Sequence, residues 1–476
     1  MPRQKRHDFY NRQAPKWQDG YFVPSHPDLI KKHPKDWDWI DTLAALKTMV
    51  RNPVEASTEV TRTTPVVQVK SLGHHMTVLH DPEAIRHCFV ENHENYRLHP
   101  TRQNVLEPIL KQGLLTTEGE KWKHSRRVIA PMFVPRQVKK FSPAMQATTQ
   151  RALSDLFNET GTFHFSDKML TLAYFVLSET LFSGDIDEAG QDTLRDVGSF
   201  MESLGKADPL DILMVPRWIP RLTKLSGQAG VKRLRRTVRE LITQRRAQIE
   251  TDKTAPEDFL TLLLTAGRDD NEALSETEIE DQIMTFIGAG HETTSRALTW
   301  MFYLLSQDTK ARARLEAEID ALDMSQPADL WEQFMPWSMA CFEEAMRLYP
   351  PAAIISRQAI APDTIGDIII PKDGAVLINQ WTLHRHELLW ERPNSFDPER
   401  FLPENRQNID RMQYIPFGLG HRVCIGQRFA MQKTAILIAL IAKSFRFDYA
   451  GETPPWPLMR ITLQADNGMP MTVTKR

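Results

Sequence analysis

Of the residues that could do chemistry in this chain, Cys424 has the most specific surroundings. It lies in the segment PFGLGHRVCIG (residues 416–426), directly before an apolar stretch that extends to Ala442. A cysteine ligates metals or attacks electrophiles as the thiolate, which requires a lowered pKa. Backbone amides at the start of a following helix would stabilise that negative charge. The segment therefore predicts a functional thiolate, with a buried structural cysteine beside a glycine turn as the alternative.

The residues around Cys424 point to one cofactor. Gly418 and Gly420 allow the chain to bend beneath a planar group, and Gly426 allows the helix to approach that group closely. The pattern Phe-x-x-Gly-x-Arg-x-Cys-x-Gly resembles the haem-binding loop of the cytochromes P450. The resemblance implies that Cys424 is the axial ligand of the iron of haem b and that Arg422 pairs with a haem propionate. The loop residues that it places beside the haem are Phe417, Gly418, Ile425 and Gly426.

A second segment, GAGHETT (residues 288–294), combines small residues with an acid and an alcohol. Glycine within a helix costs about 1 kcal/mol relative to alanine, so it needs a reason there. Ala289 and Thr293 share a helix face, where small side chains leave room for a flat cofactor and for a groove that admits oxygen. Breaking the O–O bond of dioxygen requires protons, and a hydroxyl beside a carboxylate suits their relay. The alternative is a kink where two helices cross.

This second segment is similar to the oxygen-activating motif of the cytochromes P450, in which an acid precedes an alcohol. The resemblance implies catalytic roles for Glu292 and Thr293 and places Ala289 and Gly290 beside the haem. It implies a monooxygenase, in which the thiolate pushes electron density into the iron and favours O–O cleavage.

Two further groups of residues resemble parts of the same family. Glu344 and Arg347 precede Pro350-Pro351, and Arg400 follows in the segment FDPERF. An i,i+3 ion pair is usually a surface feature, but a buried pair needs a further hydrogen-bonding partner, which Arg400 offers. The resemblance implies a structural network of these three residues that braces the cysteine loop. It also implies that Trp122, Arg126 and Arg357 reach the haem propionates.

The resemblance extends in motif order from about Leu114 to the C-terminus, and the chain departs from it at two positions. His386 stands where many members have Asp, and we expect little consequence. The triplet Met431-Gln432-Lys433 stands where an acidic residue is frequent. We expect this second departure to alter the surface that faces the electron donor.

The residues that we expect around the substrate are apolar, which favours a small apolar substrate. Fatty acids, terpenoids and aromatic compounds all remain open. The predicted pocket residues are Leu115, Phe286, Ile354 and Ile355.

The chain has no flavin- or dinucleotide-binding motif, so we expect no bound flavin. A separate ferredoxin or flavodoxin with its reductase is therefore implied as the electron donor. Basic residues near Trp122 form either a patch for an acidic donor or a solvated helix face. These residues are Lys121, Lys123, Arg127, Lys139 and Lys140.

Three functions are compatible with a haem-thiolate centre. The favoured one is a monooxygenase that hydroxylates its substrate with oxygen from O2. A peroxygenase or peroxide isomerase is the first alternative, and the pair Glu292-Thr293 counts against it. A non-enzymatic haem gas sensor is the second, and it would have no need of a proton relay.

Composition excludes several other classes of protein. The net charge of −2 gives no reason to expect a nucleic-acid partner. The three cysteines are far apart and form no CxxC pair, which indicates a reducing compartment. No apolar run is long enough for a membrane span, and residues 1–13 do not resemble a signal peptide. We expect a cytoplasmic monomer.

The elements that must position these residues are mainly helices. A capping box at residues 275–278 begins a very long helix, and a buried helix follows Cys424. Strand-like patterns at about 60–80 and 354–380 predict a small β-sheet. The expected fold is the mainly α cytochrome P450 fold, with residues 1–476 forming one catalytic domain and the haem between the long helix and the cysteine-loop helix. The apolar stretch 209–220 is either a packed loop or a lid.

Overall fold

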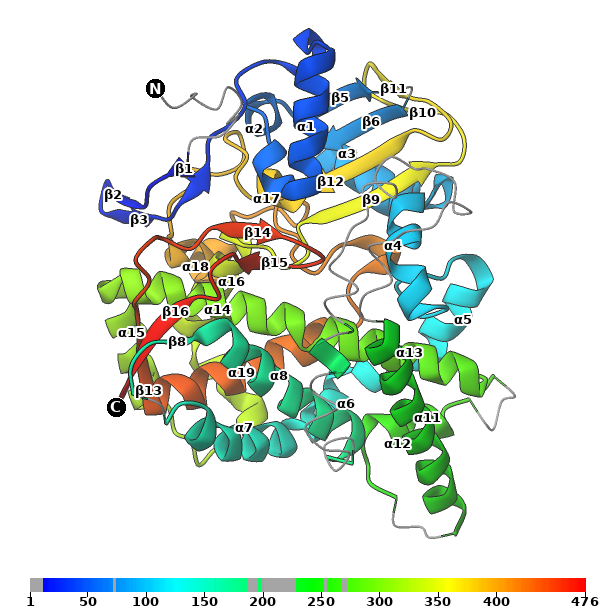
Figure 1. Ribbon diagram of the computed structural model, residues 1–476, viewed down its shortest axis with the longest axis vertical. Coiled ribbons are helices and arrows are strands. Elements are labelled where there is room, and N and C mark those ends of the chain that lie inside the picture. The colour runs from blue at the N-terminus through cyan, green and yellow to red at the C-terminus, as the bar shows by residue number, and fades with distance from the viewer. Residues whose placement is uncertain are drawn as a thin grey trace.

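The computed structural model describes residues 12–71, 74–158, 160–185, 196–198, 200, 228–251, 255–267 and 272–476. A helical body makes up most of this chain, and a smaller β-rich part covers one end of it (Figure 1). The predicted fold class, mainly α with a small sheet, is confirmed. The stretch 209–220, predicted as a packed loop or a lid, lies outside the described residues.

The β-rich part is built on a five-stranded sheet that joins the two predicted strand regions. Its strand order is β5 (Val66–Ser71), β6 (His74–Leu79), β12 (Ala375–Asn379), β9 (Ile354–Ala359) and β7 (Tyr96–Leu98). β12 runs parallel to β6 and antiparallel to β9. Val376 and Ile378 are buried while their neighbours are partly exposed, as the two-residue period of a strand requires. In β9, Ile354 packs against the main core, whereas Ile355 packs against the smaller core of the sheet. Arg357 lies two residues after Ile355 and therefore shares its face of the strand.

Two short strands, β10 (Asp363–Ile365) and β11 (Ile368–Ile370), lie within the predicted region 354–380. The other short strands were not predicted. They are β1 (Arg12–Gln13), β2 (Lys16–Gln18), β3 (Tyr21–Val23), β4 (His26–Pro27), β8 (Phe163–His164), β13 (Phe445–Tyr449), β14 (Pro457–Met459), β15 (Leu463–Ala465) and β16 (Pro470–Lys475). Of these, β8, β16 and β13 form one sheet whose strands are far apart in sequence. Most of these segments have two or three residues, which are too few to show a period of two.

Two helices replace the single long helix that was predicted. The capping box is present, since the Ser275 hydroxyl accepts from the Glu278 amide and the Glu278 carboxylate accepts from the Ser275 amide. Helix α13 (Glu276–Gly290) ends at the small residues, and α14 (Glu292–Gln307) continues beyond His291. The predicted kink therefore lies in the middle of the motif that also carries the acid and the alcohol.

The helix after Cys424, α19 (Gln427–Ser444), is the buried helix that the apolar run predicted. Every residue from 432 to 442 is buried, which identifies it as a core element rather than a surface one. It packs against α7 (Ser142–Leu156), α14 and α16 (Pro336–Leu348). None of the helices in the described ranges is long and apolar enough to cross a membrane.

The remaining helices are divided between the helical body and the β-rich part (Figure 1). They are α1 (Trp39–Arg51), α2 (Val60–Thr63), α3 (Pro82–Arg86), α4 (Pro100–Leu110), α5 (Gly119–Ile129), α6 (Pro135–Lys140), α8 (Phe165–Phe182), α11 (Gln228–Thr251), α12 (Phe259–Thr265), α15 (Thr309–Ala321), α17 (Gln380–Leu383) and α18 (Pro403–Arg406). Helix α16 ends at Leu348, because the two prolines at 350 and 351 cannot continue it.

Candidate active site

The loop that leads to Cys424 is closed by its own backbone. The amide of Cys424 donates to the Phe417 carbonyl over 2.8 Å. Gly420 has a φ of +63°, and a Cβ there would lie 2.2 Å from the carbonyl oxygen of Phe89. Gly418 also has a positive φ, of +73°. These glycines are required because the loop turns in the left-handed region while pressed against the turn η3 (His87–Glu91).

Cys424 is the only one of the three cysteines with an exposed side chain, since Cys88 and Cys341 are buried. All three are free thiols within the described chain. Burial by the surrounding protein raises the pKa of Cys424, while the backbone N–H of Gly426 and the guanidinium of Arg126 lower it. The side chain is thus accessible although protein surrounds it, and an amide donor is directed at its sulfur from the residue before α19.

Trp122 and Arg126 of α5 lie beside Arg422 of the cysteine loop. Arg126 donates to the Val423 carbonyl over 2.9 Å, and Arg422 donates to the Thr117 carbonyl over 2.8 Å. The Trp122 ring is 4.4 Å from the guanidinium of Arg422 and 5.5 Å from that of Arg126. The structure therefore brings together the three residues that the sequence related only by resemblance.

Arg357 extends this group from strand β9 and is only 5% exposed. Burial, followed by the nearby cations Arg102 and Arg422, lowers its pKa to about 9. Burial lowers the pKa of Arg422 to about 10. Arg102, in α4, was not predicted, because no motif marks it. None of Arg102, Arg126, Arg357 and Arg422 forms an ion pair with a carboxylate among the described residues.

These arginines fit a haem. Four cations that share one partly buried region repel one another, and two propionates would neutralise them. The Nδ1 atom of His421, whose ring lies 5.3 Å from that of Trp122, is also buried without a hydrogen-bond partner in the described structure. The propionates of a haem would supply acceptors for these groups, and Cys424 would supply the thiolate that such a haem requires.

The break between α13 and α14 holds the predicted acid and alcohol. The Thr293 hydroxyl donates to the Ala289 carbonyl over 2.9 Å, and both residues are partly exposed. The Glu292 carboxylate lies 3.2 Å from the guanidinium of Arg296, one turn further along α14. The alcohol thus points back along the helix at its break, while the acid is held by a cation.

Two of the predicted residues have packing contacts that were not predicted. A Cβ on Gly290 would lie 2.9 Å from Leu177 of α8, so the absence of a side chain permits close packing of α13 and α8. The place of Gly290 beside the haem stays a prediction. Phe286 packs on Phe259 and Phe133, with ring centroids 4.8 and 5.6 Å away, and Phe133 continues to Phe429 of α19. The structure therefore places Phe286 in an aromatic cluster rather than with the other pocket candidates.

Leu115 and Ile354 are partly exposed apolar residues packed against the main core, and Ile355 packs against the smaller core of the sheet. A Cβ on Gly418 would lie 3.8 Å from Cδ1 of Ile355, which links β9 to the cysteine loop.

The segment before Leu115 is fixed to α13. The Gln112 amide donates to Asp281 and the Leu114 amide to Gln282, both over 3.0 Å. Between them, a Cβ on Gly113 would meet Thr285 at 1.9 Å.

Glu344, Arg347 and Arg400 lie in one buried network. Arg347 donates to both carboxylate oxygens of Glu344 and to the carbonyls of His384, Pro393 and Ser395. Arg400 lies 3.7 Å from Glu344. The imidazole of His384 accepts from the Ile415 amide over 3.1 Å, and the Ile415 carbonyl accepts from Gly418. The network therefore reaches the cysteine loop through His384.

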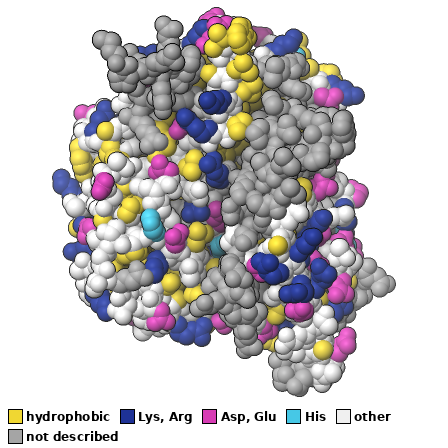
Figure 2. Space-filling view, viewed as in Figure 1, with side chains coloured by type: hydrophobic (Ala, Val, Ile, Leu, Met, Phe, Trp, Pro, Cys, Tyr) yellow, Lys and Arg dark blue, Asp and Glu magenta, His cyan; other side chains and the backbone are white. Residues whose placement is uncertain are grey.

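The predicted basic patch consists of paired charges. The five ion pairs are Lys121–Glu278, Lys123–Glu120, Arg127–Glu272, Lys139–Asp329 and Lys140–Glu257. On the face shown in Figure 2, basic side chains over α11 are also interspersed with acidic ones, as in the pair Arg236–Glu240. Gln432 and Lys433 are buried, so the expectation that they alter the donor-facing surface was wrong.

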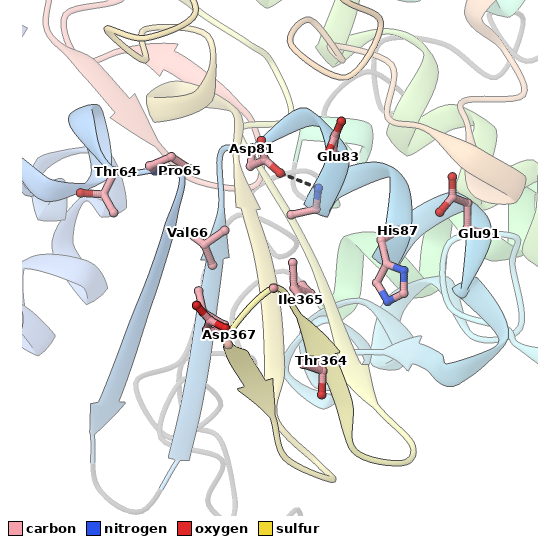
Figure 3. A pocket seen from close by; sticks show the side chains of 13 residues that line it. Thr64, Pro65, Val66, Asp81, Glu83, His87, Glu91, Thr364, Ile365 and Asp367 are labelled. Carbon is pink, nitrogen blue, oxygen red and sulfur yellow. Dashed lines mark hydrogen bonds between the residues drawn. The ribbon is translucent and has the colours of Figure 1, made fainter.

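A second, open pocket of about 680 Å³ lies between α3 and the hairpin of β10 and β11 (Figure 3). Its walls include Asp81, Glu83, His87, Glu91 and Asp367. Asp81 caps α3 through the Ala84 amide, so it serves the fold. None of the predicted site residues lines this pocket, and no cluster suited to a metal ion occurs in the described chain.

Comparisons with known proteins agree with this arrangement. The chain is 31% identical over 394 residues to cyclooctatin synthase of Streptomyces melanosporofaciens, covering 80% of this chain and 83% of that protein. It is 27% identical over 425 residues to the chloroplastic protein LUTEIN DEFICIENT 5 of Arabidopsis thaliana, covering 84% and 70%.

Solved structures share the fold. The haem domain of cytochrome P450DA matches with a TM-score of 0.75 and 24% identity, covering 87% of this chain and 90% of that one. Retinoic acid-bound cyanobacterial CYP120A1 matches with a TM-score of 0.74 and 22% identity, covering 87% and 92%. The predicted P450 fold is thereby confirmed. Since the family model for Cytochrome P450 also matches residues 34–469, this chain belongs to the cytochrome P450 family of haem-thiolate monooxygenases.

Proposed function

We propose that this enzyme hydroxylates a small apolar organic substrate with one oxygen atom from O2, using electrons from a separate ferredoxin or flavodoxin and its reductase. The observation that carries this proposal is the Thr293 hydroxyl at the break between α13 and α14. A helix that only crosses a neighbour needs no alcohol at its break, whereas proton delivery to oxygen does. When bound, haem b supplies the centre that reduces and activates O2.

The residues of the chain would hold the haem at both its iron and its propionates. Cys424 would be the axial ligand, with the Gly426 amide directed at its sulfur. The propionates would pair with the arginine group of Arg126, Arg357 and Arg422, which is partly buried and forms no ion pair among the described residues. Burial lowers the pKa of Arg357 and Arg422 more than the nearby carboxylate of Glu118 raises it. The loop and helix residues that would border the flat faces are Phe417, Gly418, Ile425, Gly426 and Ala289.

Thr293 and Glu292 would handle protons in different ways. The Thr293 hydroxyl is partly exposed and can exchange its present acceptor, the Ala289 carbonyl, for water. Glu292 is about 10% exposed, and its carboxylate is held 3.2 Å from the guanidinium of Arg296. We therefore assign the alcohol the direct role and the carboxylate the role of ordering its surroundings.

The proposed substrate is apolar because Leu115, Ile354 and Ile355 offer carbon surface and no polar group beside the cysteine loop. We further propose that residues 1–476 act as one catalytic unit, in the cytoplasm, as a monomer and without nucleic acid. The free thiols support a reducing compartment such as the cytoplasm. The net charge of −2 supports the absence of a nucleic-acid partner.

Spectra and turnover test the proposed function. The reduced protein with carbon monoxide should show the red-shifted Soret band of a thiolate ligand, and Cys424→His should lose that shift while keeping haem. Product should require NAD(P)H, a ferredoxin or flavodoxin with its reductase, and O2. Product formed from peroxide alone would favour a peroxygenase, and ligand binding without any turnover would favour a gas sensor.

A further inference from the structure

Lys433 is a basic residue in the interior of this protein. It lies on α19, and its side chain has 0% exposure. Its Nζ atom donates to the backbone carbonyl of Gly290 over 2.6 Å. Gly290 is the last residue of α13, so this bond joins α19 to the break beside Glu292 and Thr293.

A lysine in this position is costly unless it has a specific partner. Burial alone lowers its pKa to about 7, and no carboxylate pairs with it among the described residues. The ring of Phe429, on the same helix, is 5.9 Å away. The charged groups nearest the break on α14 are the Glu292–Arg296 pair, and the Nδ1–H of His291 donates to the Ile287 carbonyl. The Gly290 carbonyl is thus the one close polar partner that the described structure gives Lys433.

The break explains why that carbonyl needs a donor. The helical ladder is interrupted at His291, which separates α13 from α14. The Ala289 carbonyl accepts from the Thr293 hydroxyl, and the next carbonyl along the chain accepts from Lys433. A buried carbonyl without a partner costs about 1–3 kcal/mol, so side chains that satisfy both carbonyls stabilise the open shape of the break.

We propose that Lys433 is a positioning residue for oxygen activation: its bond to the Gly290 carbonyl holds the α13–α14 break in the shape that leaves the Thr293 hydroxyl available at the groove. This inference rests on the proposed role of Thr293.

Two variants and one control test this role. Lys433→Met keeps the length and apolar stem of the side chain and removes the donor, and Lys433→Gln keeps an N–H donor without charge. Lys443→Met is the control, because Lys443 lies on the same helix but is exposed and pairs with Asp320. Thr293→Ala provides the reference for loss of the alcohol itself.

In Lys433→Met we expect the amides of His291 to Ser295 to exchange hydrogen at least tenfold faster. We also expect product per NAD(P)H to fall at least threefold as peroxide release rises, with the substrate Kd and the thiolate Soret band unchanged. Lys433→Gln should recover part of both effects, and Lys443→Met should match the unmodified enzyme. A merely structural role would instead shift the thermal midpoint and the substrate Kd without changing the partition of electrons.

The proposal would be overturned if Lys433→Met left the amide hydrogen exchange of His291 to Ser295 unchanged. It would also be overturned if exchange became faster while the product formed per NAD(P)H stayed the same. If Thr293→Ala also leaves the partition unchanged, the proposed role of Thr293 has failed rather than that of Lys433. Should the variants not fold, the unmodified protein still gives a test. The protons on Nζ of Lys433, observed by NMR in ¹⁵N-labelled protein, should exchange with solvent at least tenfold more slowly than those of Lys443. Equal rates would contradict the buried hydrogen bond from Lys433 to the Gly290 carbonyl.

Discussion

The guanidinium of Arg347 donates to both carboxylate oxygens of Glu344, over 2.6 and 2.7 Å, where neither side chain is exposed. The remaining donors of Arg347 reach three backbone carbonyls in the segment that leads to the cysteine loop. A buried ion pair is tolerated when its other hydrogen bonds are satisfied, and this pair meets that condition. The pair thereby fixes the backbone between His384 and Ser395, most of which lies outside helices and strands.

Removal of one partner of this pair should destabilise the protein strongly. In Arg347→Met, Glu344 is left as a buried carboxylate without its partner, which costs about 3–5 kcal/mol. The free energy of unfolding in urea and the haem content after purification measure the effect. Lys123→Met is the matched control, because Lys123 pairs with Glu120 at the same i,i+3 spacing on the surface. If both variants unfold at the same urea concentration, the network does not brace the loop.

Loss of the Thr293 hydroxyl should uncouple electron use from product. We expect Thr293→Ala to form product about 100-fold more slowly, the lower end of what general acid catalysis contributes. NAD(P)H consumption should continue and peroxide should accumulate. Thr293→Ser keeps the hydroxyl and should retain most of the coupling. Normal coupling in the alanine variant would exclude a direct role for this alcohol.

Arg357 should have opposite effects on the haem-bound and haem-free protein. In Arg357→Leu the haem Kd should rise about 10–100-fold, since a charged hydrogen bond contributes about 1.5–3 kcal/mol. Without haem the same variant should be at least as stable as the unmodified chain, because a buried cation beside Arg102 and Arg422 has been removed. Arg97→Leu, on the adjacent strand, is the control, since Arg97 is exposed and pairs with Asp373. If haem-free Arg357→Leu were less stable than the unmodified chain, the proposed repulsion between Arg357 and the cations Arg102 and Arg422 would be contradicted.

Acid should destabilise the fold through a buried histidine. Burial lowers the pKa of His291 from 6.5 to about 4. Between these two pH values the unfolded chain binds a proton at His291 that the folded chain does not bind. The contribution of neutral His291 to the free energy of unfolding is therefore full above pH 6.5 and is lost as the pH falls through about 4. The loss amounts to about 3 kcal/mol at 1.36 kcal/mol per pKa unit. His291→Gln should flatten the dependence of the unfolding free energy on pH by this amount, and an unchanged curve would refute the assignment.

The sequence was informative where local rules decide the structure. The capping box at Ser275, the end of α16 before Pro350 and the buried helix after Cys424 all follow from nearest neighbours along the chain. The packing of Gly290 on Leu177 of α8 was not predicted, because residue spacing identifies a helix face without identifying the element packed on it. Contacts between distant segments carried no local signal.

Charged residues show the same limit. Arg102 belongs to no motif, and its importance emerges only when β9 and the cysteine loop bring other arginines beside it. Lys433 was assigned to the surface because lysines are almost always solvated. The partners of the basic residues near Trp122, such as Glu272 and Glu278, come from a segment more distant in sequence.

The attachment of Gln112, Gly113 and Leu114 to α13 has a practical meaning for redesign. Two hydrogen bonds from backbone amides and a close contact at a glycine fix this segment to α13. The backbone next to Leu115 therefore cannot shift without disturbing α13. A library that seeks new substrates should hold residues 112–114 constant and vary position 115 together with Ile354. In such a library, only the volumes of the side chains would change the shape of the pocket, while the backbone of residues 112–114 and of α13 would stay the same in every variant.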